Sequence, residues 1–177
     1  KDDFRLLDEG TAQTITHFSA ERSPVSLGIV LDSSDSMDGE KMDAARTALT
    51  RLLFDLLDAE DEVFLYRFDE RPVLLQGWTT DRQLVARALD RVNPNGATAL
   101  YDAVAEAIPL VESGRHRKKT LLIICDGNDT SSATRLATVQ RQIRESEALV
   151  YAIGIDATSV PRTRMPSPLP PRRPIPI

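Results

Sequence analysis

The sequence predicts an α/β protein with a doubly wound, mostly parallel sheet and helices on both faces. Apolar runs at 25–31, 62–68 and 120–125 have the length of strands, and the first and last are hydrophobic on both faces, as in buried parallel strands. Segments with apolar residues at helical spacing separate these runs. Strands that alternate with helices of this length form βαβ units, whose right-handed crossovers build a parallel sheet.

The amino-terminal stretch predicts a small β-hairpin ahead of this domain. Two β-prone runs, Phe4–Leu7 and Thr11–Phe18, flank Asp8-Glu9-Gly10, which has the composition of a turn. Residues 1–22 are too few to form a core of their own. We therefore expect them to be an arm or the remnant of a preceding β domain, and we expect residues 23–156 to form the α/β domain.

Four amphipathic segments are expected to cover the sheet. They are 41–58, 81–91 (Leu84, Val85, Ala88 and Leu89 inward), 99–112, and 132–145 (Leu136, Val139 and Ile143 inward). Two further strands are expected, a short edge strand at Pro72–Gln76 and a last strand at Leu149–Ile155. Arg115–Lys119 is expected to be a solvated basic turn between a helix and a strand.

The carboxyl-terminal residues 157–177 differ in character from the rest of the chain. Residues 160–177 hold seven of the eleven prolines and four arginines, with no acidic residue. Proline cannot donate a backbone hydrogen bond, so this segment is predicted to be an extended or disordered tail. Pro168–Arg172 resembles a polyproline-II ligand, but a lone motif of this kind is a weak signal and a tail without function is the favoured interpretation.

Composition excludes several classes of protein. The formal net charge of -5 argues against a general nucleic-acid binder, which carries a basic surface. No apolar run approaches the roughly 18 residues of a membrane span. Cys125 is the only cysteine, so an internal disulfide and a thiolate metal cluster are excluded, and its apolar neighbours predict a buried thiol. The chain starts at Lys1 without a signal-peptide pattern, which fits an excised or processed piece and leaves its location open.

The candidate functional site starts where the first buried strand ends. Asp32, Ser34 and Ser36 follow the apolar run at alternate positions, so three side-chain oxygens can turn toward one point. In α/β proteins ligands bind just outside the carboxyl ends of the strands. Oxygen donors suit a hard divalent cation such as Mg²⁺ or Ca²⁺, although serine and aspartate are also common in turns and at helix N-caps.

Two downstream residues strengthen this interpretation. Thr98 precedes a predicted helix after a glycine-containing loop, and Asp126 follows the strand at 120–125. Each has a simple structural explanation, as an N-cap and as part of a turn. However, the βαβ topology brings all three loops to one edge of the sheet. Two carboxylates there would repel each other, and a bound cation would remove that cost.

These residues resemble the metal-ion-dependent adhesion site of von Willebrand factor type A (vWA) domains, which have a Rossmann-like fold. The D-x-S-x-S element is Asp32, Ser34 and Ser36, the threonine is Thr98, and the second aspartate is Asp126. The similarity covers about residues 1–156, and the opening 3–18 resembles the lead-in of a bacterial subgroup. The final strand and helix of the family are not visible after Asp156, so no allosteric switch is expected.

The resemblance implies a binding module rather than an enzyme. In the family, the three hydroxyls contact the metal and the two aspartates act directly or through water. The implied ion is Mg²⁺, with Mn²⁺ or Ca²⁺ as alternatives, and it offers an open coordination position to an Asp or Glu carboxylate of a partner protein. No nucleic-acid partner is implied. Likeness to the bacterial subgroup leans toward an exported protein of the cell envelope or a secreted one.

Asp35 departs from the family pattern, which usually has glycine at this position. Its negative charge beside the site predicts tighter metal binding and weaker attraction for an acidic partner. Unchanged affinities in Asp35→Gly would contradict this prediction.

Three rival interpretations remain open. A structural assembly subunit could carry an idle metal site. A Mg²⁺-dependent phosphotransferase could use Asp32 as its nucleophile, although Ser34 stands where that chemistry needs a second acid. A hydrolase triad would have only His17 and His116 to draw on, and these are expected away from the site.

Further residues are interpreted without a role in the site. Caps or solvated loop residues are expected at Asp38, Asp69, Asp102 and Asp129. Trp78 belongs either to the core or to the rim of the site, and the sequence leaves both open.

Overall fold

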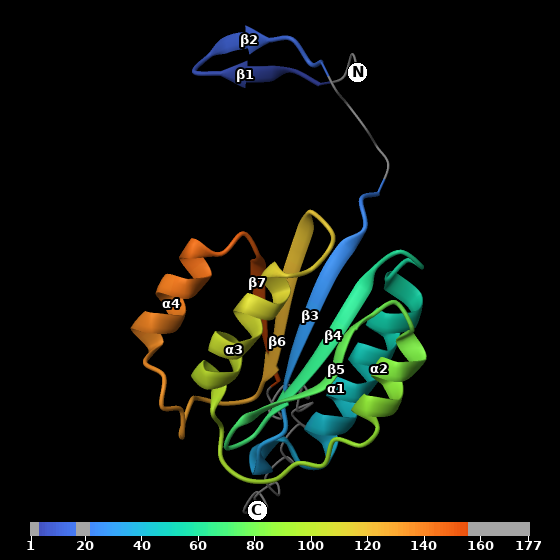
Figure 1. Ribbon diagram of the computed structural model, residues 1–177, viewed down its shortest axis with the longest axis vertical. Helices are drawn as coiled ribbons and strands as arrows, with labels where there is room; N and C mark the ends of the chain where they lie inside the picture. Colours follow the sequence, from blue (N-terminus) through green and yellow to red (C-terminus); the bar gives the residue numbers. More distant parts are fainter. Residues whose placement is uncertain (1–3, 17–21, 156–177) are drawn as a thin grey trace, which may run out of the picture.

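A five-stranded sheet with helices on both faces forms the main part of the protein (Figure 1). The computed structural model describes residues 4–16 and 22–155. The strand order is β5-β4-β3-β6-β7, and only β5 runs antiparallel to its neighbour. The strands are β3 (Val25–Asp32), β4 (Glu62–Phe68), β5 (Pro72–Thr79), β6 (Lys118–Cys125) and β7 (Leu149–Gly154). The predicted fold class, a doubly wound and mostly parallel sheet, is confirmed.

The helices divide between the two faces of the sheet and give it two cores. One core lies under α1 (Glu40–Arg51), its π-helical continuation η2 (Leu52–Leu56) and α2 (Arg82–Leu89). The other lies under α3 (Leu100–Glu112) and α4 (Leu136–Glu145). Alternate residues of β3 enter opposite cores, Ile29 and Leu31 the first and Val30 the second.

Within the described residues, no helix is long and apolar enough to cross a membrane.

The predicted amino-terminal hairpin is present. It pairs β1 (Leu6–Asp8) with β2 (Thr11–Gln13) in antiparallel register. Glu9 and Gly10 both have positive φ, +47° and +83°, which the type I′ turn of a two-residue hairpin requires. All residues of both strands are exposed, so the hairpin has no core of its own. The Pro/Arg-rich tail predicted at 157–177, and His17 and Phe18, lie outside the described residues.

The start of α4 differs from the prediction, because the first turn of α3 holds the preceding loop. The Ser132 hydroxyl accepts hydrogen bonds from the backbone N–H groups of Tyr101 and Asp102. The Asp102 carboxylate accepts in turn from the backbone N–H groups of Ala133 and Thr134, at 2.9 and 2.8 Å. Ser132 therefore caps α3, Asp102 holds residues 133 and 134, and α4 begins only at Leu136.

Smaller differences concern exposure and strand ends. Leu84 and Leu136, predicted to face inward, are exposed at 38% and 47%. In α2 Val85 and Leu89 face the core as predicted, and Leu136 is the first residue of its helix. The edge strand β5 continues to Thr79, and β6 begins at Lys118, inside the segment predicted as a basic turn.

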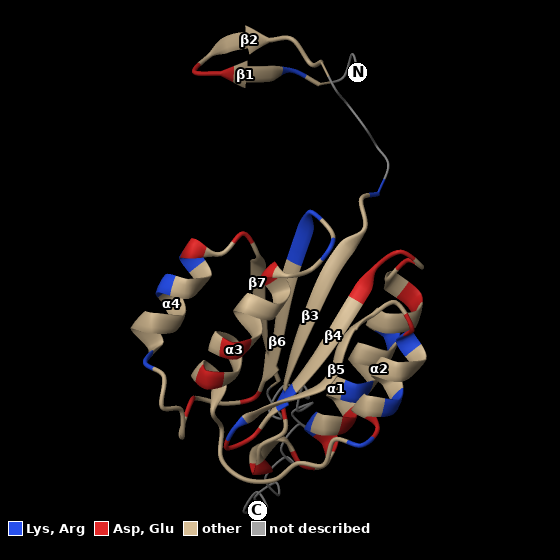
Figure 2. Cartoon of the chain, viewed as in Figure 1, with Lys and Arg blue, Asp and Glu red and all other residues tan. Residues whose placement is uncertain are grey.

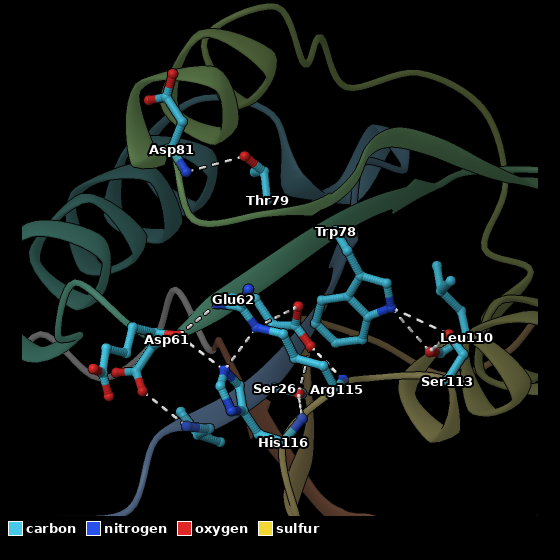
Figure 3. Close-up of polar contacts among 12 residues, drawn as sticks. Ser26, Asp61, Glu62, Trp78, Thr79, Asp81, Leu110, Ser113, Arg115 and His116 are labelled. Atoms are coloured by element: carbon cyan, nitrogen blue, oxygen red, sulfur yellow. Dashed lines mark hydrogen bonds and ion pairs between the residues drawn. The ribbon is translucent and has the colours of Figure 1, made fainter.

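A buried polar network closes the end of the sheet where β3 and β4 begin (Figure 3). Ser26 donates to Glu62 at 2.7 Å, and the same Glu62 oxygen accepts from the backbone N–H of Arg115 at 2.6 Å. The backbone N–H of His116 donates to Ser26. His116 thus lies at the opposite end from the candidate site, as predicted.

Trp78 belongs to the core at this same end. Its ring packs edge-on against Phe64, with centroids 4.7 Å apart. Its Nε1 donates to the carbonyl of Leu110 at 3.2 Å (Figure 3). The Phe64 ring fits because Gly28 faces it across the strand pair. A Cβ at Gly28 would lie 2.2 Å from the ring and 2.8 Å from Leu121. Trp78 is therefore a packing residue and not a rim contact.

Candidate functional site

The carboxyl ends of β3 and β6 place the predicted site residues at one edge of the sheet. These strands are parallel neighbours with Leu31 opposite Ile124, so Asp32 lies beside Cys125 and near Asp126. After Asp32 the chain forms the short helical turn η1 (Asp35–Met37) and then enters α1. The central strands carry charged residues only toward their ends, as Figure 2 shows. The candidate site is therefore a polar rim on an apolar sheet.

Asp32 is fully buried, and both of its carboxylate oxygens accept a hydrogen bond. Oδ1 accepts from the backbone N–H of Ser34 at 2.8 Å, and Oδ2 accepts from the Cys125 thiol, with Sγ 2.9 Å away. Burial, and then the hydrogen bond to Asp32, raise the pKa of the Cys125 thiol to about 12. The thiol therefore stays protonated and acts as a donor. These two donors fix the orientation of the Asp32 carboxylate.

Ser34, Ser36 and Asp126 form a connected chain of oxygen atoms. The Ser34 and Ser36 hydroxyl oxygens are 3.2 Å apart, and Ser36 donates to Asp126 Oδ1 at 2.8 Å. Ser34 is buried and the Asp126 side chain is only 1% exposed, whereas Ser36 is exposed to solvent. The oxygen chain thus leads from the buried Ser34 hydroxyl and the buried Asp126 carboxylate to the exposed Ser36.

Thr98 lies on the neighbouring loop, which is fastened to the loop after β3. The backbone N–H of Asn95 donates to the carbonyl of Ser33 at 2.8 Å, three residues before Thr98. Gly96, at φ +80°, lies in the same loop. Thr98 is buried, and its backbone exchanges hydrogen bonds with Thr130, which follows β6. The structure thus joins Asp32, Ser34, Ser36 and Asp126 by direct hydrogen bonds, whereas the contacts of Thr98 run to Thr130.

The donor set is composed of oxygen atoms and includes hydroxyl groups. Within residues 4–16 and 22–155, no group of three His, Cys, Asp or Glu side chains could hold a metal ion. A cation here would therefore need the serine and threonine hydroxyls beside the two aspartates. Neutral and anionic oxygen donors are the ligands that Mg²⁺, Mn²⁺ and Ca²⁺ take. The buried carboxylates and the solvent-facing Ser36 fit such an ion.

Three of the other acidic residues near the rim, which were predicted to be caps or solvated loop residues, have partners in the structure. Asp69 pairs with Arg67 and accepts from the backbone N–H of Arg71. Asp129 accepts from the backbone N–H of Tyr101, at the start of α3. Asp102 holds the loop before α4, as described above. A polar cavity of about 260 Å³ adjoins this rim; its lining consists of Arg67, Asp69, Glu70, Arg71, Asn95 and Gly96.

Two contacts of the site were not predicted from the sequence. Cys125 was expected only as a buried thiol, yet it donates to Asp32. Lys41, in the first turn of α1, forms an ion pair with Asp126 Oδ2. A cation at the amino end of a helix interacts unfavourably with the helix dipole. The position of Lys41 in the first turn of a predicted helix is therefore the sequence feature that could have indicated a contact with an acidic residue.

Comparison with known proteins places the domain in a family. Residues 27–128, which contain all five candidate site residues, match the family model of the von Willebrand factor type A domain. An uncharacterized protein of Synechocystis is 28% identical over 125 residues, which are 67% of this chain and 30% of that protein. Mouse inter alpha-trypsin inhibitor heavy chain 4 is 24% identical over 147 residues, 75% of this chain and 16% of that one. The chain thus spans less than a third of either relative.

Solved structures share the fold. A von Willebrand factor type A protein of Catenulispora acidiphila superposes with a TM-score of 0.62 at 25% identity, covering 73% of this chain and 32% of that one. The von Willebrand factor domain of the type V pili tip protein Mfa5 of Porphyromonas gingivalis gives 0.55 at 18%, covering 67% and 44%. Together with the family model, these matches show that the chain belongs to the von Willebrand factor type A domain family.

Proposed function

We propose that this chain is a non-catalytic protein-binding module that depends on a divalent metal ion. Domains of this family mediate protein–protein interaction and adhesion and are generally not enzymes. In this proposal Asp32, Ser34, Ser36, Thr98 and Asp126 hold Mg²⁺, or Mn²⁺ or Ca²⁺ in its place. When bound, the ion supplies an electrophilic centre with an open position for an Asp or Glu carboxylate of a partner protein.

The position of Ser36 carries the proposal. Ser36 is exposed, yet its hydroxyl is hydrogen-bonded to Asp126 at 2.8 Å and lies 3.2 Å from that of Ser34. The buried carboxylate of Asp126 therefore meets solvent through this residue, and Ser34 connects it to the loop that Asp32 holds. A partner carboxylate approaching here reaches the oxygen cluster without opening the core. The hydroxyls add no charge, so they leave a cation able to attract an anionic ligand.

The environment of Asp32 argues against the phosphotransferase alternative. A nucleophilic carboxylate needs an oxygen free to attack a phosphorus atom. Both oxygens of Asp32 accept hydrogen bonds, from Ser34 and Cys125, and the residue is 0% exposed. In the proposed function Asp32 holds the loop and a cation and does not approach a substrate.

The location of the protein is part of the same proposal. We infer an exported bacterial protein, either of the cell envelope or secreted, because the opening residues 3–18 resemble the lead-in of a bacterial subgroup. Protease treatment of intact cells would test this inference, because the protease digests a protein exposed outside the cell and leaves an internal one intact.

Water-proton relaxation with Mn²⁺ tests the binding function directly. An open position that holds water gives the Mn²⁺-loaded protein a high relaxivity, which falls when a carboxylate replaces that water. We expect a Gly-Gly-Glu-Gly-Gly peptide to lower the relaxivity and the matching peptide with a central glutamine to leave it unchanged. Bound Mn²⁺ that responds to neither peptide would indicate an idle site in a structural subunit. Absence of Mn²⁺ binding would contradict the proposal.

A further inference from the structure

Within the described residues, Lys41 is the only cationic side chain that contacts either of the two buried aspartates of the candidate site. It lies in the first turn of α1, and its ammonium group forms an ion pair with Oδ2 of Asp126. The lysine side chain is 22% exposed and the aspartate side chain 1%. The amino end of a helix favours acidic residues, and Glu40 and Asp43 occupy the same turn. Asp126 therefore compensates a charge that the helix itself disfavours.

The ammonium group lies against one of the atoms that the proposed metal site needs. Oδ1 of Asp126 accepts from the Ser36 hydroxyl, and Oδ2 pairs with Lys41. A divalent ion bound to this cluster would stand beside the ammonium group. Two cations near one carboxylate repel each other, and this repulsion is weakly screened where the side chains are mostly buried.

We propose that Lys41 is a built-in competing cation that sets the metal affinity of the site. This inference rests on the proposed function and names a residue that controls it. Lys41 neutralises Asp126 when it points inward, and it must leave Oδ2 before a divalent ion can take that oxygen. The site therefore binds metal only at concentrations that outcompete its own lysine.

The lysine side chain is suited to this exchange. Its four-carbon stem is flexible and its ammonium group is strongly hydrated, so it can turn outward to solvent from its partly exposed position. A site that is open for only a fraction of the time binds its ligand more weakly by that fraction. Removal of the ammonium group should remove this loss of affinity and leave the oxygen donors in place.

Titration of the purified chain with Mg²⁺ by calorimetry, and with Mn²⁺ by electron paramagnetic resonance, tests the inference. Lys41→Met keeps the apolar stem and removes the charge, whereas Lys41→Arg keeps the charge. Lys118→Met is the matched control, because Lys118 is exposed at the start of β6, the end of the strand opposite to Asp126. Circular dichroism shows that each variant is folded before titration.

We expect Lys41→Met to bind both metals about tenfold more tightly than the wild type, a coupling of ordinary size. Lys41→Arg should stay weak, and Lys118→Met should match the wild type. In EDTA, Lys41→Met should melt below the wild type because Asp126 has lost its counter-ion. Equal or weaker metal binding by Lys41→Met would overturn the role of Lys41.

The outcomes also separate this inference from the proposed function. If the wild type and Lys41→Met bind metal equally well, the metal site stands and the competition is wrong. If only Lys41→Met binds metal, the competition stands, but the metal-dependent function proposed for the wild type is wrong. If neither protein binds Mg²⁺ or Mn²⁺, both the metal-dependent function and the competition are wrong.

Discussion

Asp35 and Gly96 are hydrogen-bonded in both directions across two loops of the candidate site. The backbone N–H of Asp35 donates to the carbonyl of Gly96 at 3.0 Å, and the N–H of Gly96 donates to Asp35 Oδ1 at 2.9 Å. Gly96 has a φ of +80°, which glycine adopts without strain. The carboxylate that departs from the family pattern thus fastens the loop that leads to Thr98.

Variants of Asp35 should separate this anchoring from the effect of its charge. Asp35→Asn keeps an acceptor for Gly96, whereas Asp35→Ala removes it, and both remove the charge. We expect Asp35→Ala to lower the free energy of unfolding by about 1 kcal/mol, and Asp35→Asn to stay near the wild type in urea titrations. Metal affinity should fall in both variants. Equal stability of the two variants would show that the carboxylate does not anchor the loop.

The Cys125 thiol should be unreactive in the folded protein. Burial and the hydrogen bond to Asp32 raise its pKa to about 12, against about 8.5 for a free cysteine. At pH 8 we expect iodoacetamide to modify the folded chain about a thousandfold more slowly than the chain in urea. Mass spectrometry of timed samples measures both rates. Modification of the folded chain at the rate of a free thiol would contradict the protonated donor role.

A related pH dependence follows from the same thiol. Its pKa is raised in the folded state, so its contribution to stability is complete below the unfolded pKa of about 8.5. That contribution is lost as the pH rises from there toward 12. Cys125→Ser should therefore lose less stability between pH 8 and about 10 than the wild type does, as measured by urea unfolding.

Asp102 should make the loop before α4 sensitive to acid. Burial raises the pKa of Asp102, but hydrogen bonds from the Thr134 side chain and from the backbone N–H groups of Ala133 and Thr134 lower it by more. The pKa of Asp102 is therefore below its usual value. Its contribution is present above the unfolded pKa of about 3.9 and is lost as the pH falls through the lower folded pKa. The thermal melting midpoint of Asp102→Asn should therefore fall less between about pH 5 and pH 3 than that of the wild type.

An exposed aspartate on another element is the matched control for this acid dependence. Asp55 is exposed in η2, and Asp55→Asn should lose stability in acid as the wild type does. The assignment to Asp102 is wrong if Asp102→Asn and Asp55→Asn follow the same melting curve against pH.

The sequence predicted the layers of the fold better than the limits of its elements. Uniformly apolar runs identify strands buried on both faces, and helical spacing identifies what covers them. Contacts between distant residues decide the limits, however. Ser132 continues the pattern of α4 but caps α3, and Lys118 is charged and exposed yet pairs with Val25 through the backbone. Neither contact leaves a signal in the local sequence.

The same distinction holds for the site. Strand ends and parallel topology were enough to predict that Asp32, Ser34, Ser36 and Asp126 would meet, and hydrogen bonds now join them. Side-chain reach was not predictable. The Lys41 ammonium spans from α1 to Asp126, and the Cys125 thiol turns toward Asp32. Whether these residues bind a metal ion remains a prediction of the sequence and of the proposed function.

Thermal melting in EDTA, Mg²⁺, Mn²⁺ and Ca²⁺ tests the central claim most directly. A ligand that binds only the folded state stabilises it by about 2.7 kcal/mol at a hundredfold excess over its dissociation constant. We expect a metal-dependent rise in the midpoint of the wild type and of Asp38→Ala, which removes an exposed acid from the same segment. Asp32→Ala should show no rise. A wild type that responds to none of the metals, or a rise that survives in Asp32→Ala, would contradict the proposed site.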